Sequence, residues 1–129
     1  MMKKQSTILI IDDSTLMREI ASDMLKLLDL AVLTAANGAE GMTIFQQNPI
    51  DLILLDVNMP IMNGAETYRA LLELNPDVNV IICSTESQSK VQVRFGELPI
   101  PIYLHKPFDT AVLLDTVQNM LTKRPLPSH

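Results

Sequence analysis

One cysteine and four glycines in 129 residues are too few for two classes of protein. A disulfide scaffold needs several paired cysteines and a collagen-like chain needs glycine at every third position, so both classes are excluded. The single Cys83 lies in an apolar run, which predicts a buried small hydrophobe in a reducing compartment. Long apolar stretches are missing too. The longest aliphatic runs, such as Ile8–Ile11 and Leu52–Leu55, end at an Asp after four residues and cannot span a bilayer.

Positive charge is also scarce, because 10 Lys and Arg stand against 15 Asp and Glu, for a formal net charge of −5. This acidic excess disfavours non-specific binding to nucleic acid and docking on an anionic membrane. Lys3 and Lys4 precede the apolar run Ile8–Ile11, but Asp12 ends that run short of the roughly 7–15 residues that a signal peptide requires. The sequence therefore predicts a soluble, cytoplasmic protein with no nucleic-acid or membrane partner for this domain.

The composition is that of a globular protein, with 47% hydrophobic and 19% charged residues. The length corresponds to about one domain of the usual roughly 100–200 residues. We expect residues 1–122 to form that domain. Residues 123–129 are expected to be a tail or the start of a linker, because Pro125 and Pro127 cannot continue a helix.

Five short runs rich in aliphatic and β-branched residues are expected to be strands. Several are apolar throughout, which is typical of strands covered on both faces. They occupy residues 7–11, 32–35, 51–55, 80–84 and 102–104. Apolar stripes with helical spacing lie between and after them, formed in the first helix by Met17, Ile20, Ala21, Met24, Leu27 and Leu28, and in the last by Leu113, Val117, Met120 and Leu121. This order predicts an α/β fold with a doubly wound, five-stranded parallel sheet and helices on both faces.

Three helix starts carry capping signals. Asn37 with Glu40, and Asn63 with Glu66, have the spacing of a capping box with Asn at the cap. Asp109 is a candidate cap for the last helix.

The segment between the fourth and fifth strands fits the pattern least well. Val91, Val93 and Phe95 alternate with polar residues, which is a strand period, and Gly96 and two prolines follow. We therefore expect the fourth helix to be short or irregular.

Polar residues follow four of the expected strands. Asp12 and Asp13 end the first, Asp56 the third and Ser84 the fourth, and Lys106 follows the fifth. In an open α/β sheet, ligands bind beyond the carboxyl ends of the strands, so these side chains are expected to share one rim. Neighbouring carboxylates cannot all ionise without a cation, and hard oxygen ligands suit Mg²⁺. A carboxylate beside Mg²⁺ and a lysine can attack phosphorus and form an acyl phosphate.

The motifs that carry these residues resemble the response-regulator receiver domain. The matching segments are residues 8–14, 51–60, 63–64 and 106–108, and their order and spacing agree over about residues 6–122. The resemblance implies a flavodoxin-like sheet with strand order 2-1-3-4-5. It also implies a switch rather than an enzyme, phosphorylated by a histidine kinase or a phosphotransfer domain.

The resemblance assigns chemical roles around the site. Asp56 matches the phosphoacceptor and Lys106 the lysine that pairs with the phosphoryl group, with a cis bond to the proline that follows. Asp12 and Asp13 match the acidic pair that holds Mg²⁺, with Asp13 and Asp56 favoured as direct ligands. Asn58 matches the position that gives its backbone carbonyl to the metal.

Further positions match the switch and its tuning. Ser84 matches the hydroxyl that moves toward the phosphoryl group, and Tyr103 matches the aromatic residue that turns inward with it. Asn58 and Glu86 occupy the tuning positions. Thr85 stands where similar proteins carry Ala or Gly, and its β-branched side chain is expected to narrow access to the phosphoryl group.

The resemblance also implies an output surface, a face formed by the fourth helix, fifth strand and fifth helix that binds a downstream protein. Residues 98–101, Leu-Pro-Ile-Pro, depart from the family pattern beside this face. Asp29 departs from it too, at the end of the first helix, where glycine is usual.

Two other functions stay open at this stage. A Mg²⁺-dependent phosphatase with an aspartyl nucleophile uses the same residue types, although such enzymes place the nucleophile after the first strand. The chain could also be an adaptor receiver that is never phosphorylated. Its kinase, its oligomeric state and its context, as a stand-alone regulator or a segment of a longer protein, are left open.

Overall fold

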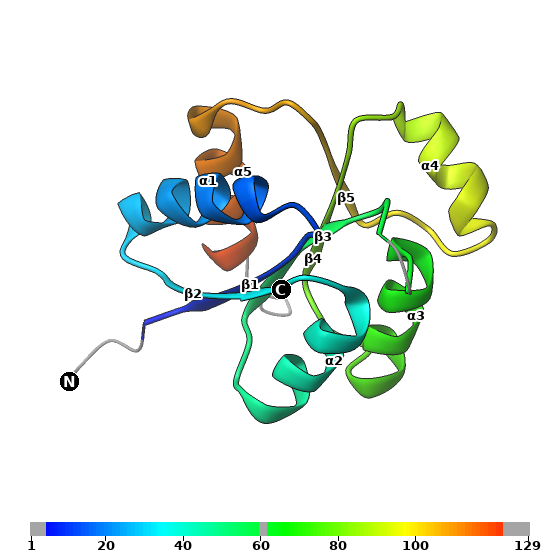
Figure 1. Cartoon of the computed structure of the whole chain (residues 1–129), viewed down its shortest axis with the longest axis horizontal. Coiled ribbons are helices and arrows are strands. Elements are labelled where there is room, and N and C mark those ends of the chain that lie inside the picture. The colour runs from blue at the N-terminus through cyan, green and yellow to red at the C-terminus, as the bar shows by residue number, and fades with distance from the viewer. Residues whose placement is uncertain (1–4, 60–61, 123–129) are drawn as a thin grey trace, which may run out of the picture.

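A computed structural model describes residues 5–59 and 62–122, so the expected tail at 123–129 lies outside the described residues. Strands and helices alternate along the chain (Figure 1). In chain order they are β1 (Thr7–Ile11), α1 (Thr15–Leu25), a 3₁₀ turn η1 (Lys26–Leu28), β2 (Ala31–Ala35), α2 (Gly38–Gln47), β3 (Leu52–Asp56), α3 (Gly64–Leu74), β4 (Val80–Ser84), α4 (Gln88–Phe95), β5 (Ile102–His105) and α5 (Thr110–Thr122). Among the described helices, none combines the length and apolar character needed to cross a bilayer.

All five strands join one parallel sheet in the order β2-β1-β3-β4-β5. The predicted fold class and strand order are thus confirmed. Each strand lies within one residue of its predicted run. Because the strands are parallel, their carboxyl ends meet at one edge of the sheet, where the predicted site residues lie.

Two hydrophobic cores cover the two faces of the sheet. On β1, Ile8 and Ile10 pack into the core beneath α1 and α5, whereas Leu9 and Ile11 pack into the core beneath α2, α3 and α4. This division follows from the strand period, which points successive side chains to opposite faces. Figure 1 shows the same layers, with α1 and α5 on one side of the sheet and α2 and α3 on the other.

The predicted apolar stripe of the first helix is wrong at Leu27. Leu25 is fully buried, whereas Leu27 is 71% exposed. The row that faces the core contains Ala21, Leu25 and Leu28, whereas Leu27 continues the row of Ile20, which is itself 37% exposed. The α-helix ends at Leu25 and is followed by η1. Asp29 then adopts the left-handed conformation, with φ of 57°, at the position where the family usually carries glycine.

The fourth helix, α4, has eight residues, as the expectation of a short helix requires. Val91 and Phe95 are buried, and they lie four positions apart on one helical face, while Val93 is 81% exposed. Residues four positions apart share a face in a strand and in a helix alike, so the burial of Val91 and Phe95 fits both periods. The exposure of Val93 fits only the helix. The chain leaves α4 at Gly96, whose φ of 62° suits glycine.

The capping signals are confirmed in two cases and in part in the third. At α3, Asn63 accepts a hydrogen bond from the Glu66 backbone, and the Glu66 side chain accepts one from the Asn63 backbone. At α2, the Asn37 side chain likewise accepts from the Glu40 backbone N–H. The Glu40 side chain, however, accepts from the backbone N–H of Ala36 and not from that of Asn37. Asp109 accepts from the third residue of α5.

Replacing Asn63 with Ala should lower the free energy of unfolding by about 1 kcal/mol, because it removes the side-chain oxygen that accepts from the Glu66 backbone N–H. Urea denaturation of the two proteins measures the difference. Asn119→Ala is a suitable control, since Asn119 is exposed in the interior of α5. A loss at Asn63 no larger than that at Asn119 would show that the box adds nothing to stability.

Candidate functional site

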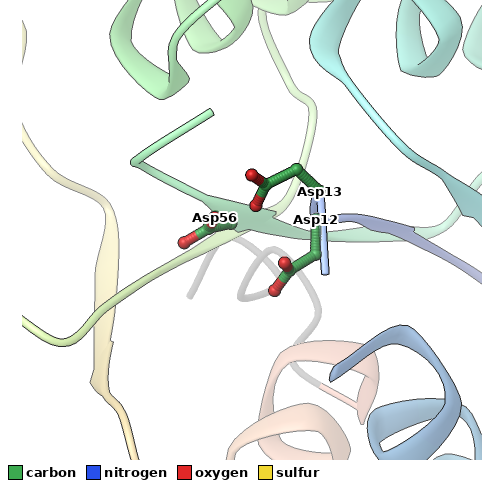
Figure 2. A group of neighbouring side chains, drawn as sticks. All are labelled: Asp12, Asp13 and Asp56. Carbon is green, nitrogen blue, oxygen red and sulfur yellow. The ribbon is translucent and has the colours of Figure 1, made fainter. Parts of the chain in front are cut away.

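Three carboxylates meet at the carboxyl edge of the sheet. Asp12 and Asp13 directly follow β1, and Asp56 is the last residue of the neighbouring β3. Each offers an oxygen within 4.8 Å of the others. Figure 2 shows the three side chains gathered at these two strand ends. Asp12 and Asp56 are buried, whereas Asp13 is exposed. The parallel pairing of β1 and β3 therefore assembles the predicted acidic cluster.

Lys106 reaches this cluster from the other side. Its backbone N–H donates to the Ser84 carbonyl at 2.7 Å, which holds the start of the loop after β5 against the end of β4. Its ammonium lies 2.8 Å from Asp12 Oδ2 and 3.1 Å from Asp56 Oδ1. The peptide bond to Pro107 is cis, as the resemblance implies. The Lys106 ammonium thus contacts two buried carboxylates that are distant in sequence, 94 residues away for Asp12 and 50 for Asp56.

The charges of this cluster are incompletely balanced. The pKa of Asp56 is raised from 3.8 to about 6, chiefly by burial and also by the negative charges of Asp12 and Asp13, against the opposing effect of Lys106. For Lys106, burial lowers the pKa, but the hydrogen bond to Asp12 and the charge of Asp56 outweigh it and leave the pKa raised. The site therefore holds Lys106 protonated and has a residual preference for added positive charge.

The donor set fits Mg²⁺, which prefers hard oxygen ligands and binds through one or two carboxylates. Asp12 uses both oxygens within the protein, since Oδ1 accepts from the Ser14 N–H at 2.9 Å and Oδ2 accepts from Lys106. Asp56 contacts Lys106 through Oδ1. Exposed Asp13 and the Oδ2 atom of Asp56 are therefore better suited to direct contact with a cation than Asp12 is.

The two predicted switch residues meet at Glu86. The Ser84 hydroxyl, fully buried at the end of β4, accepts a hydrogen bond from the Glu86 N–H at 2.9 Å. Tyr103, on β5, donates its hydroxyl to the Glu86 carbonyl and, at 3.3 Å, to the Ser84 carbonyl. Burial raises the pKa of Tyr103. The two side chains thus share one backbone partner in the loop between β4 and α4, where Thr85 is exposed.

The two predicted tuning positions are joined by a residue that the sequence did not indicate. Arg94 of α4 binds both carboxylate oxygens of Glu86, with Nη2 at 2.8 Å from Oε2, and its Nη1 donates to Asn58 Oδ1 at 2.7 Å. The Asn58 amide donates to Glu86 Oε1 at 3.3 Å. These bonds from Arg94 lower the pKa of Glu86. No period or motif links residues 58, 86 and 94, so only the fold could reveal the contact.

Arg18 also contacts the site without having been predicted. Its Nη1 donates to the Asp12 carbonyl at 2.7 Å, and its Nη2 donates to Thr15 at 3.2 Å. It lies one helical turn after Ser14, whose hydroxyl caps α1. An arginine in the first turn of a helix that follows an acidic pair could have indicated this contact.

A family model described as "Response regulator receiver domain" matches residues 8–118. Among solved structures, the chemotaxis protein CheY4 of Vibrio cholerae has a TM-score of 0.81 at 30% identity, covering 92% of this chain and 100% of that one. The response regulator TrrA of Thermotoga maritima, solved in complex with Mg²⁺ and BeF, has a TM-score of 0.80 at 26% identity and covers 91% and 100%.

Among curated relatives, the sensor kinase/phosphatase LuxN of Vibrio campbellii is 33% identical over 91% of this chain but only 14% of its own length. The transcriptional regulatory protein PrrA of Mycobacterium tuberculosis is 33% identical over 91% of this chain and 50% of its own length. The chain thus spans half or less of these two relatives. By contrast, it covers 96% of the chemotaxis protein CheY of Halobacterium salinarum at 27% identity. Because the family model covers most of the chain and the fold agrees, this chain belongs to the response-regulator receiver domain family.

Proposed function

We propose that Asp56 is the phosphoacceptor of this receiver domain and takes a phosphoryl group from the phosphohistidine of a histidine kinase or a phosphotransfer domain. One observation carries the proposal. The Asp56 carboxylate is buried at a strand end, 3.1 Å from the Lys106 ammonium and within 4.8 Å of two further carboxylates. This arrangement combines a nucleophilic oxygen with charges suited to a transferring phosphoryl group.

The transfer balances as a displacement at phosphorus. A carboxylate oxygen of Asp56 forms the new bond to phosphorus, and the bond between phosphorus and the donor nitrogen breaks. The bonding electron pair leaves with the donor imidazole, which takes up a proton. The product is an acyl phosphate on Asp56, and the Lys106 ammonium next to Asp56 Oδ1 is placed to stabilise its negative oxygens.

The acidic pair and the loop after β3 would hold the metal. Asp13 and Asp56 would be direct ligands, Asp12 would support them, and Asn58 would contribute its backbone carbonyl. When bound, Mg²⁺ neutralises charge on the phosphoryl oxygens. The complex of the relative TrrA with Mg²⁺ and BeF supports the same use of this chain's acidic cluster.

Phosphorylation would then switch an output surface. Ser84 and Lys106 would contact the new phosphoryl group, and Tyr103 would follow because it shares Glu86 with Ser84. The surface is the face of α4, β5 and α5. Its exposed apolar side chains, Val93, Ile102 and Val112, supply the kind of contact area that a downstream protein partner uses.

In this proposal the domain acts in the cytoplasm as a switch and contacts neither nucleic acid nor membrane. Its only chemistry is its own phosphorylation and dephosphorylation. The acidic composition of the chain supports the absence of polyanionic partners.

The test is incubation of the wild-type chain with Mg²⁺ and acetyl phosphate, a small-molecule phosphodonor. We expect a mass increase of one phosphoryl group that hydroxylamine removes, as it does for an acyl phosphate, and that a metal chelator prevents. Failure to bind Mg²⁺ at millimolar concentration together with no mass increase would favour the adaptor function. Sustained hydrolysis of an added phosphate ester would instead favour the phosphatase.

A further inference from the structure

The side chains of Asn58, Glu86 and Arg94 form a cluster of mutual hydrogen bonds near the Asp56 site, built around the ion pair of Glu86 and Arg94. Arg94 contacts both carboxylate oxygens of Glu86 and the Oδ1 atom of Asn58, and Asn58 also donates to Glu86. Each member therefore contacts the other two. The paired arrangement of guanidinium and carboxylate is the geometry in which arginine binds an acid most strongly.

The cluster joins the two loops that border the phosphoacceptor. Asn58 lies two residues after Asp56, and Glu86 lies two residues after Ser84. Arg94 comes from neither loop, because it is in the last turn of α4. Arg94 and Asn58 both line a cavity of about 490 Å³ beside the segment that follows Asp56. The cluster therefore lies next to the residues that directly follow Asp56 and Ser84 at the carboxyl edge of the sheet.

The charge of Glu86 matters at this position. Phosphodonors are anions, and the site already contains three carboxylates, with the Lys106 ammonium in contact with two of them and Arg18 bound to the Asp12 backbone carbonyl. A fourth unpaired carboxylate at the rim would repel the donor. Arg94 pairs with that carboxylate, and because the Arg94 side chain is 48% exposed the ion pair is open to solvent.

We propose that Arg94 is a positioning residue for phosphoryl transfer that acts through Glu86, whose negative charge it neutralises so that an anionic phosphodonor can reach Asp56. This inference rests on the proposed phosphoacceptor function. It assigns to α4 a role in uptake of the phosphoryl group, in addition to its place in the output face.

Charge alone then predicts the order of the labelling rates with acetyl phosphate. Arg94→Ala exposes the Glu86 charge and should slow labelling about 3-fold at low ionic strength. Glu86→Gln leaves the Arg94 charge unpaired and should speed labelling by a similar factor. The double variant Arg94→Ala/Glu86→Gln has the wild-type net charge and should label at close to the wild-type rate. Raising the salt concentration should compress all these differences.

Binding of Mg²⁺ alone gives a readout of opposite sign. The cation is attracted by the same charge that repels the donor, so Arg94→Ala should bind Mg²⁺ more tightly and Glu86→Gln less tightly than wild type. Titration calorimetry in the absence of phosphodonor measures this affinity. A variant that merely distorted the loops would weaken both Mg²⁺ binding and labelling, and would not reverse their order.

Arg69→Ala is the matched control, because Arg69 is an exposed arginine on α3 and its removal changes the net charge equally. It should leave both measurements near wild type. If Arg94→Ala labels as fast as wild type or faster, or if it loses both Mg²⁺ affinity and labelling, the role assigned to Arg94 is wrong. Absence of labelling in the wild-type chain would count against the phosphoacceptor function itself, which keeps the two failures distinct.

Discussion

Replacing Asp56 with Asn should reduce phosphoryl uptake from acetyl phosphate by roughly 100-fold or more, because the amide lacks the nucleophilic carboxylate oxygen. The change is nearly isosteric, so the neighbouring Asp12 and Lys106 keep their contact at 2.8 Å. The measurement is the fraction of chain that carries a hydroxylamine-sensitive phosphoryl group after incubation with Mg²⁺ and the donor.

Asp115→Asn provides the control for this experiment. Asp115 is exposed on α5, and its replacement changes the net charge by the same amount. It should label at the wild-type rate. Equal labelling of the Asp56 variant and wild type would show that another residue accepts the phosphoryl group.

The same replacement should stabilise the metal-free protein at neutral pH. Burial first, and then the neighbouring acids, raise the pKa of Asp56 to about 6 in the folded chain, from 3.8 when unperturbed. The folded state therefore binds this proton more tightly than the unfolded state does. The stabilisation is present below about pH 4 and is lost as the pH rises through about 6. Above that range the ionised carboxylate costs about 3 kcal/mol, since each pKa unit corresponds to about 1.4 kcal/mol.

Urea denaturation in the presence of a chelator, at a series of pH values, tests this expectation. Asp56→Asn should exceed wild type by up to about 3 kcal/mol at pH 7.5, and the difference should shrink toward zero near pH 4. Adding Mg²⁺ should narrow the gap at pH 7.5, because the metal stabilises only the protein that binds it. Asp115→Asn again serves as the control. A variant less stable than wild type at pH 7.5 without metal would contradict the charge balance described for the site.

Replacing Asp56 with Asn is thus expected nearly to abolish phosphoryl uptake and, at the same time, to stabilise the metal-free protein. The carboxylate that the chemistry requires is the group whose ionisation the folded state resists, because it is buried close to the Asp12 and Asp13 carboxylates. A binding cation or a transferring phosphoryl group finds a site that is arranged before it arrives. The lower stability caused by the ionised Asp56 carboxylate is therefore the cost of a site that is arranged in advance for the reaction.

The helical turn after α1 shows where sequence patterns stop being informative. Residues 17–28 carry an apolar stripe with helical spacing, yet Leu27 is exposed and Leu25 is buried. The pattern contains no sign that the α-helix gives way to a 3₁₀ turn at Lys26. Which of the apolar rows on the helix faces the sheet depends on how the helix packs, and that is a property of the tertiary structure.

The sequence by itself determined the sheet and the position of the acidic site. Apolar runs of strand length, separated by helical stripes, are specific to a doubly wound parallel sheet. Once the strands are parallel, residues that follow them must share one edge. For this reason Asp12, Asp13, Asp56 and Lys106 could be grouped from the sequence. In the structure the three carboxylates lie within 4.8 Å of one another, and Lys106 contacts Asp12 and Asp56.

Only the tertiary structure decided how the side chains at that edge pair. The contact of Arg94 with Glu86 and Asn58 joins one helix to two loops, and the Glu86 backbone binds both Ser84 and Tyr103. Such contacts depend on the angle at which α4 packs and on side-chain rotamers. The pKa of Asp56 likewise depends on burial and on neighbours distant in sequence. Local patterns specify the period of each element, whereas these quantities arise from distances between elements.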